Sequence, residues 1–146
     1  MQVRAMASGA AAVVLGLVSG CTVEPPPTTI ELVNATDLDV RPNLYTSGSA
    51  SDAAGLFVGS NLRQDFTARP FPELRGGESV SLTLGCEEVA SLGVDAPVFF
   101  DAVSLTVEVS GERIWLRRGR DFECGATVRF VYFAEGEAFG VRAEFP

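Results

Sequence analysis

Short runs in which apolar and polar residues alternate make up most of the chain after residue 28. Residues 79–85 alternate Ser and Thr with Val and Leu, and residues 103–109 repeat that pattern. Alternating runs of this length, separated by turns rich in Gly and Asn, predict β-strands at the spacing of a sandwich or barrel. We therefore expect an all-β fold, a single β-sandwich over residues 29–146, mainly antiparallel and immunoglobulin-like or a related Greek key.

The remaining segments refine this expectation. Residues 126–133 are apolar on both faces and predict a central strand, with residues 138–145 as its antiparallel neighbour. Pro42 cannot donate to a strand ladder and predicts an edge strand or a bulge. Residues 34–37 form a predicted turn. Residues 56–58 and 62–67 are short strand candidates, residues 47–52 a loop, and residues 87–92 a single helical turn.

The position of Trp115 relative to the two cysteines differs from the pattern of immunoglobulin domains. Immunoglobulin domains place a tryptophan near the first of two bridged cysteines, whereas Trp115 lies much closer to Cys124 than to Cys86. The sequence therefore predicts a β-sandwich without specifying the immunoglobulin topology.

The first 21 residues have the composition of an export signal. Arg4 gives a basic start, residues 5–18 are apolar, and no acidic residue precedes Glu24. The apolar run is shorter than the approximately 20 residues that a membrane-spanning helix needs, and Ser19-Gly20 interrupts it. The run Leu-Val-Ser-Gly-Cys at residues 17–21 places small residues directly before a cysteine.

Residues 17–21 resemble the lipobox of bacterial lipoproteins. The resemblance implies that residues 1–20 are a cleaved signal peptide and that Cys21 carries the lipid, with palmitate among its acyl chains. The partner is then the membrane, reached through the lipid anchor, at the bacterial cell envelope. Thr22 rather than Asp follows the cysteine, which implies delivery to the outer membrane. A plain secretory signal cut elsewhere is the alternative.

Residues 21–28 form a predicted tether, in which three prolines favour an extended polyproline conformation. At about 3.1 Å per residue the tether reaches about 20 Å, so the domain would stay close to its membrane.

The composition excludes several kinds of catalytic and metal-binding site. The chain has a formal net charge of −8, and all of its basic residues are Arg, because Lys and His are absent. Without His or Lys the chain cannot build a Ser-His-Asp triad, a Cys-His pair, a His-containing zinc site or a Schiff base. The acidic balance argues against nucleic-acid binding, and no cofactor or metal motif is recognisable. The composition favours a non-catalytic protein.

Cys86 and Cys124 are the cysteines that remain beside Cys21. In an oxidising compartment two such cysteines are expected to pair. The 38-residue separation gives about 4 kcal/mol of stabilisation in the chain-entropy account. A reactive or metal-binding pair is the alternative, although the chain has no Cys-x-x-Cys motif.

Two clusters could carry function. Glu87-Glu88 and Asp95 through Asp101 could supply paired carboxylates for glycoside hydrolysis or oxygen ligands for Ca²⁺; solvated carboxylates are the alternative.

The second cluster is an arginine-rich segment. An extended strand places Arg113, Trp115 and Arg117 on one face, and Arg118 and Arg120 would extend the patch through a turn. This patch suits an anionic partner, either an acidic protein or an anionic glycan. Its alternative is an outer face whose arginines pair with acids such as Asp121 and Glu123.

The sequence thus favours a lipid-anchored envelope module with a binding, assembly or structural role. A carboxylate- or metal-dependent enzyme acting on envelope polysaccharide is the alternative.

Overall fold

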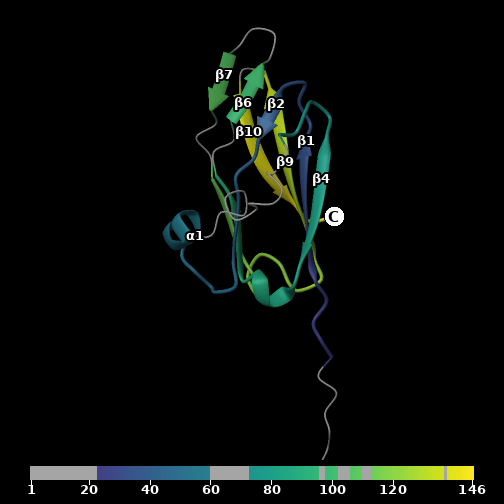
Figure 1. Cartoon of the computed structure of the whole chain (residues 1–146), viewed down its shortest axis with the longest axis vertical. Helices are drawn as coiled ribbons and strands as arrows, with labels where there is room; N and C mark the ends of the chain where they lie inside the picture. The colour runs from purple at the N-terminus through teal and green to yellow at the C-terminus, as the bar shows by residue number, and fades with distance from the viewer. Residues whose placement is uncertain (1–22, 60–72, 96–97, 102–105, 110–112, 137) are drawn as a thin grey trace, which may run out of the picture.

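The computed structural model describes residues 23–59, 73–95, 98–101, 106–109, 113–136 and 138–146, with backbone alone for residues 100–101 and 106–109. The strands lie in two facing layers, with a short helix on one flank (Figure 1). The all-β sandwich expected from the sequence is confirmed. The elements are β1 (Thr28–Asn34), β2 (Asp39–Arg41), β3 (Leu44–Ser47), α1 (Ala53–Gly59), β4 (Ser79–Leu84), the 3-10 helix η1 (Cys86–Glu88), β5 (Ser91–Val94), β6 (Val98–Asp101), β7 (Thr106–Val109), β8 (Ile114–Arg117), β9 (Thr127–Glu135) and β10 (Ala138–Glu144).

The first layer is a four-stranded sheet in the order β10-β9-β1-β4. The two central strands, β1 and β9, run parallel, and both edge strands are antiparallel to their neighbours. Buried and partly exposed residues alternate strictly along β1, as a strand with one face on a core requires. The predicted central strand is β9, and its predicted antiparallel neighbour is β10.

The second layer consists of two three-stranded sheets, β2-β6-β7 and β3-β5-β8, set nearly end to end. The pairing Arg41↔Val98 in one sheet is followed by Leu44↔Val94 in the other, a slip of one residue. Pro42 lies in the gap between β2 and β3, where its missing N–H interrupts the ladder. The predicted edge strand or bulge at Pro42 is confirmed.

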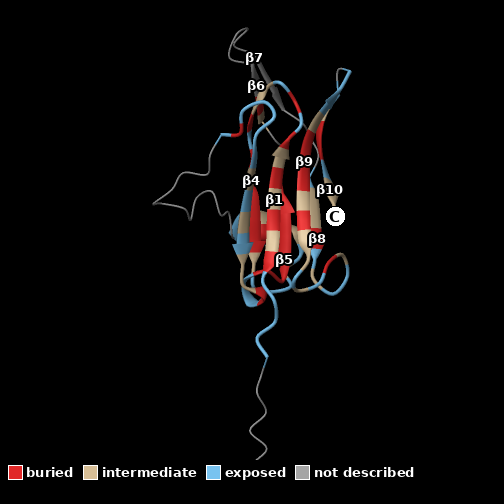
Figure 2. Ribbon diagram, turned by 90° about the vertical axis from the view of Figure 1, so that its right-hand side faces the viewer, coloured by how far each residue is buried: buried red, intermediate tan, exposed pale blue. Residues whose placement is uncertain are grey.

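Large apolar side chains from both layers fill the space between them. The first sheet contributes Ile30, Leu32 and Phe130, all fully buried, and the second layer contributes Leu44, Leu92, Val94 and Phe99. Figure 2 shows this burial along the middle of β1 and β9. Removing such side chains from water is the main stabilising term of a small sandwich.

Two predicted segments differ from the structure. The predicted helical turn at 87–92 is limited to η1, and residues 91–94 form β5, whose four residues are all buried. The predicted strand at 56–58 is instead part of helix α1, whose start is capped by Asp52 through a 2.7 Å bond from the Gly55 N–H. Both differences arise because α1 packs across Gly93 of β5, where a side chain would meet Leu56 and Phe57.

The remaining strand candidates fall partly outside the described residues. For the predicted strand at 103–109 the structure describes β7 alone, and residues 103–105, like the candidate at 62–67, are not described. Within the described residues, no helix is long and apolar enough to cross a membrane.

The N-terminal segment leaves the sandwich at the end formed by η1 and the loop between β8 and β9 (Figure 1). Residues 23–27 are exposed. Pro26 lies against Gly125, whose φ of +83° favours glycine, and the Thr29 N–H donates to the Ala126 carbonyl over 3.0 Å. The exit direction of the chain is therefore fixed by contacts with the β8–β9 loop.

Candidate functional site

The outer face of β8 carries the predicted arginine and tryptophan patch. Leu116 is buried in the core and Ile114 packs against it, so the intervening Trp115 lies on the opposite face. The predicted division of this strand into two faces matches that placement.

Arg113 is tied to two neighbours at one end of the patch. Its Nε lies 2.8 Å from Asp95 Oδ1, and its guanidinium lies over the Phe57 ring at 5.2 Å from the centroid. Asp95 and Phe57 belong to the β5–β6 connection and to α1, so Arg113 links three segments.

Trp115 is half-buried between the sheet and a second arginine. The Arg120 guanidinium lies 4.6 Å from the centroid of its ring, within the range of a cation–π contact. The chain reverses at Gly119, with φ of +80°, and returns Arg120 to the face it would otherwise leave. Trp115 Nε1 is buried and has no hydrogen-bond partner in the described part of the chain.

Asp121 organises this turn. Its carboxylate accepts from the Arg120 guanidinium over 2.8 Å and from the Arg117 backbone N–H over 2.7 Å. The hydrogen bond from Arg120, supported by the one from Arg117, lowers the pKa of Asp121. The charge of Arg120 is therefore balanced locally, as the alternative of acid-paired arginines expects.

Arg117 and Arg118 point in different directions. Arg117 is exposed, and its guanidinium makes no ion pair with any described residue. By the alternation of side chains along a strand, Arg118 falls on the same face as Leu116. Its guanidinium contacts Cys86 and not the patch. The structure thus brings together Arg113, Trp115, Arg117 and Arg120 on one side and separates Arg118 from them. The alternation of side chains along β8 could have predicted the separation of Arg118, whereas the return of Arg120 depends on the turn at Gly119.

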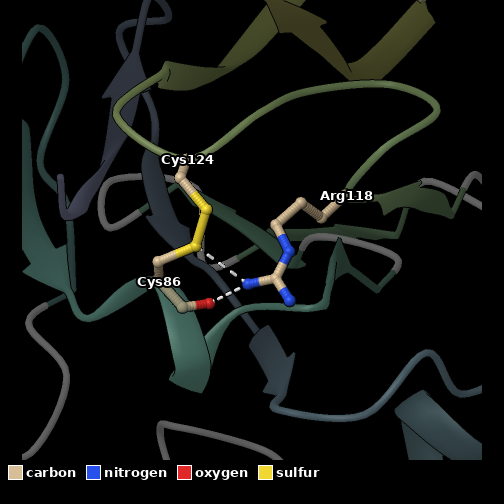
Figure 3. The surroundings of a disulfide bond; sticks show 3 residues. All are labelled: Cys86, Arg118 and Cys124. Atoms are coloured by element: carbon tan, nitrogen blue, oxygen red, sulfur yellow. Dashed lines mark hydrogen bonds between the residues drawn. A yellow bond between two sulfur atoms is a disulfide. The ribbon is translucent and has the colours of Figure 1, made fainter. Parts of the chain in front are cut away.

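A disulfide joins Cys86 and Cys124, as expected from the sequence, with their Cα atoms 5.5 Å apart (Figure 3). Cys86 belongs to η1, and Cys124 lies in the loop before β9 rather than in the strand. Arg118 Nη1 donates to the Cys86 carbonyl and lies 3.0 Å from Cys86 Sγ. Cys21, the predicted lipidation site, lies outside the described residues.

The paired carboxylates do not converge. Glu88 accepts a 2.7 Å bond from the Gly85 N–H and caps η1, while Asp95 pairs with Arg113. Glu87 is exposed, and the side chain of Asp101 is not described. Within the described residues, no three acidic or cysteine side chains gather as metal ligands would.

An open groove of about 550 Å³ lies on the outer face of the four-stranded sheet, where no sequence pattern indicated one. Its floor carries a chain of ion pairs in which Arg129 bonds Glu31 over 2.7 Å and Arg142 bonds Glu144 over 2.9 Å. These residues come from three strands, and the parallel pairing of β1 with β9 that aligns them has no signature in the sequence.

Comparison with known proteins gives a similar solved structure. No protein-family model matches the chain, and no curated protein matches it significantly. The crystal structure of the T6SS lipoprotein TssJ1 from Pseudomonas aeruginosa is similar at 18% sequence identity, with a TM-score of 0.40. The match covers 82% of this chain and 97% of that one.

Proposed function

We propose that this chain is a lipid-anchored protein of the bacterial cell envelope that displays a β-sandwich for binding or assembly. The observation that carries the proposal is the N-terminal exit: residues 23–27 leave the domain as an exposed segment shortly after the predicted lipid site. Two or more acyl chains on Cys21 would anchor the protein stably. The η1 end would then lie nearest to the membrane, which we propose to be the outer membrane.

The proposed binding surface is the outer face of β8 with the turn that follows it. Trp and Arg are enriched where interfaces derive most of their binding energy. Asp95 and Asp121 balance Arg113 and Arg120, and the Arg118 guanidinium is directed to Cys86, which leaves Arg117 as the cation of this surface with no described ion pair. An acidic protein segment or an anionic glycan would meet Arg117 beside the half-buried Trp115.

The alternative of a carboxylate- or metal-dependent enzyme gains no support from its predicted carboxylates, which do not converge in the described part of the chain. Glu88 and Asp95, two of its candidate carboxylates, are each engaged with other groups. Catalysis on a glycosidic bond would instead require two carboxylates facing one substrate.

The anchoring proposal is tested with Cys21→Ser. We expect wild-type protein to incorporate radiolabelled palmitate and to sediment with outer membranes, and the variant to do neither. Palmitate incorporation into Cys21→Ser would contradict the anchoring proposal while leaving the binding surface open to its own test.

The binding surface is tested by crosslinking in native membranes followed by affinity capture. Trp115→Ala combined with Arg117→Ala should abolish capture of the partner, and capture by the wild type should weaken with salt. Arg75→Ala, which removes an exposed arginine from the turn before β4, is the matched control. Undiminished capture by the double variant, with an unchanged melting temperature, would rule out this surface.

A further inference from the structure

The two sulfurs of the disulfide have different surroundings. Arg118 Nη1 donates to the Cys86 carbonyl and lies 3.0 Å from Cys86 Sγ, and no such contact is made with Cys124 Sγ among the described residues (Figure 3). Cys86 is 4% exposed, whereas Cys124 is half-buried in the β8–β9 loop. One sulfur is therefore covered and beside a permanent cation, and the other is more accessible.

This asymmetry bears on thiol–disulfide exchange. An attacking thiolate bonds one sulfur and expels the other as a thiolate, and the sulfur whose thiol has the lower pKa leaves faster. A neighbouring guanidinium stabilises a thiolate, and Arg remains protonated at every physiological pH. Arg118 thus favours Cys86 as the leaving group.

Acidic residues flank both cysteines and do not cancel this bias. Glu87 and Glu88 follow Cys86, and Glu123 precedes Cys124. The Glu88 carboxylate is held by the Gly85 N–H, and Glu87 and Glu123 are exposed. Solvent screens exposed charges more strongly than it screens a guanidinium in contact with a partly covered sulfur.

We propose that Cys124 Sγ is the position at which an external thiol reacts with this protein, with Cys86 released as a thiolate beside Arg118. The incoming thiolate forms a new S–S bond to Cys124 Sγ, the Cys86–Cys124 bond breaks, and its electron pair passes to Cys86 Sγ. The external thiol is the reductant, and the product is a mixed disulfide at Cys124. In the reverse direction, the Cys86 thiolate displaces that thiol and closes the native disulfide.

The proposal rests on contacts at the disulfide and is independent of lipid anchoring. It is tested on the purified full chain in detergent with reduced glutathione as the probe. The reaction is quenched with acid, the free thiols are blocked, and cleavage after arginine separates Cys86, in residues 76–113, from Cys124, in residues 121–129. We expect about ten times more glutathione adduct on Cys124 than on Cys86 at early times.

A matched pair of variants separates contact from general charge. Arg118→Gln should lower the adduct ratio several-fold and slow the opening of the disulfide, because the leaving thiolate loses its cation. The difference in exposure between the two sulfurs should leave a smaller excess of adduct on Cys124. Arg142→Gln removes the same charge from an exposed position in β10, away from the disulfide, and should leave the ratio unchanged.

Three results would overturn the proposal. These are an excess of adduct on Cys86, equal adducts in the wild type, or a ratio unchanged in Arg118→Gln, which would assign the bias to burial alone. If Arg118→Gln does not fold, Arg118→Lys keeps the charge with a different geometry and should retain part of the bias. The wild-type adduct map decides the position of attack without any variant.

Discussion

Asn34 shows how much of this sandwich depends on one polar side chain. It is fully buried at the end of β1, where its amide donates to the carbonyls of Leu38, Leu74 and Arg75 over 2.7–3.0 Å. Its Oδ1 accepts from both the N–H and the hydroxyl of Thr36. The sequence predicted a turn at 34–37, but the turn is also fastened to residues 74–75, far away in the chain.

Asn34→Asp should destabilise the domain strongly. A carboxylate has the same shape but cannot donate, so three buried or partly buried carbonyls lose their partner and face a negative charge. We expect a loss of about 3–5 kcal/mol in the free energy of unfolding, measured by urea denaturation. Asp37→Asn, which exchanges the same two side chains at an exposed position of the same turn, is the control and should change stability little. A stable Asn34→Asp variant would contradict the role assigned to the amide.

Tyr132 differs from Asn34, because its buried polar atom makes no hydrogen bond within the described part of the chain. The residue is fully buried in β9, and its hydroxyl has no hydrogen-bond partner among the described residues. Burial raises the pKa of the Tyr132 phenol well above its usual value.

Tyr132→Phe should therefore preserve or increase stability at neutral pH, by up to about 1 kcal/mol, because an unpaired hydroxyl leaves the core. The two proteins should also differ at alkaline pH. The folded state keeps the Tyr132 proton, whereas the unfolded chain releases it near the ordinary pKa of about 10. The free energy of unfolding that depends on this proton is therefore complete below pH 10 and falls above it. The variant should lose less stability above pH 10 in chemical denaturation; parallel curves would show that Tyr132 does not contribute to the alkaline transition.

At the scale of the element, β4 allows a test of strand pairing. The Asn34 N–H donates to the Glu78 carbonyl, so this pair of β1 and β4 is hydrogen-bonded. Hydrogen-bonded and non-hydrogen-bonded pairs alternate along an antiparallel ladder. Leu82 therefore directs its N–H toward Ile30, whereas Ser81 directs its N–H away from β1. Leu82 is half-buried on the inner face, and Ser81 is exposed.

Proline at these adjacent positions should have unequal effects. Leu82→Pro removes a hydrogen bond to β1 together with an apolar side chain and should cost at least about 3 kcal/mol. Ser81→Pro removes an N–H outside the β1–β4 ladder and should cost clearly less. Thermal melting of both variants measures the difference, and equal losses would show that the register alternates in the other sense.

The elements that the sequence predicted well are those in which periodicity and burial agree. In β1, β4 and β9 the alternation of side chains follows the exposure of each face. The prediction failed for β5 and α1, because Gly93 and Ala53-Ala54 give no alternation, and the burial of Gly93 comes from Leu56 and Phe57 of α1.

The candidate site was predictable only where a single strand defines it. Parity along β8 places Trp115 and Arg117 together, but the positive φ at Gly119 returns Arg120 to Trp115, and this depends on a turn. The ion pairs of the groove depend on the pairing of β1 with β9, residues separated by about a hundred positions, which no local pattern encodes.

At the scale of the whole molecule, the disulfide joins the two connections that link the layers at the end where the N-terminal segment leaves. Cys86 lies between β4 of the first layer and β5 of the second, and Cys124 lies between β8 of the second layer and β9 of the first. The bond therefore ties together two crossings between the sheets. Any force transmitted from an N-terminal anchor would enter the domain beside it.

Replacing both cysteines by alanine should destabilise the sandwich without changing its fold. The closed loop spans 38 residues, so releasing it increases the entropy of the unfolded chain and costs about 4 kcal/mol. For a domain of this size that loss lowers the melting temperature by about 10–20 °C, which is measured by calorimetry. The urea dependence should steepen, since the unlinked chain exposes more surface on unfolding. Reduced wild-type protein keeps both side chains and controls for their packing: it should melt near the variant. If reduced and oxidised wild type melt together while the variant melts lower, the loss comes from the packing of Cys86 and not from the link between the layers.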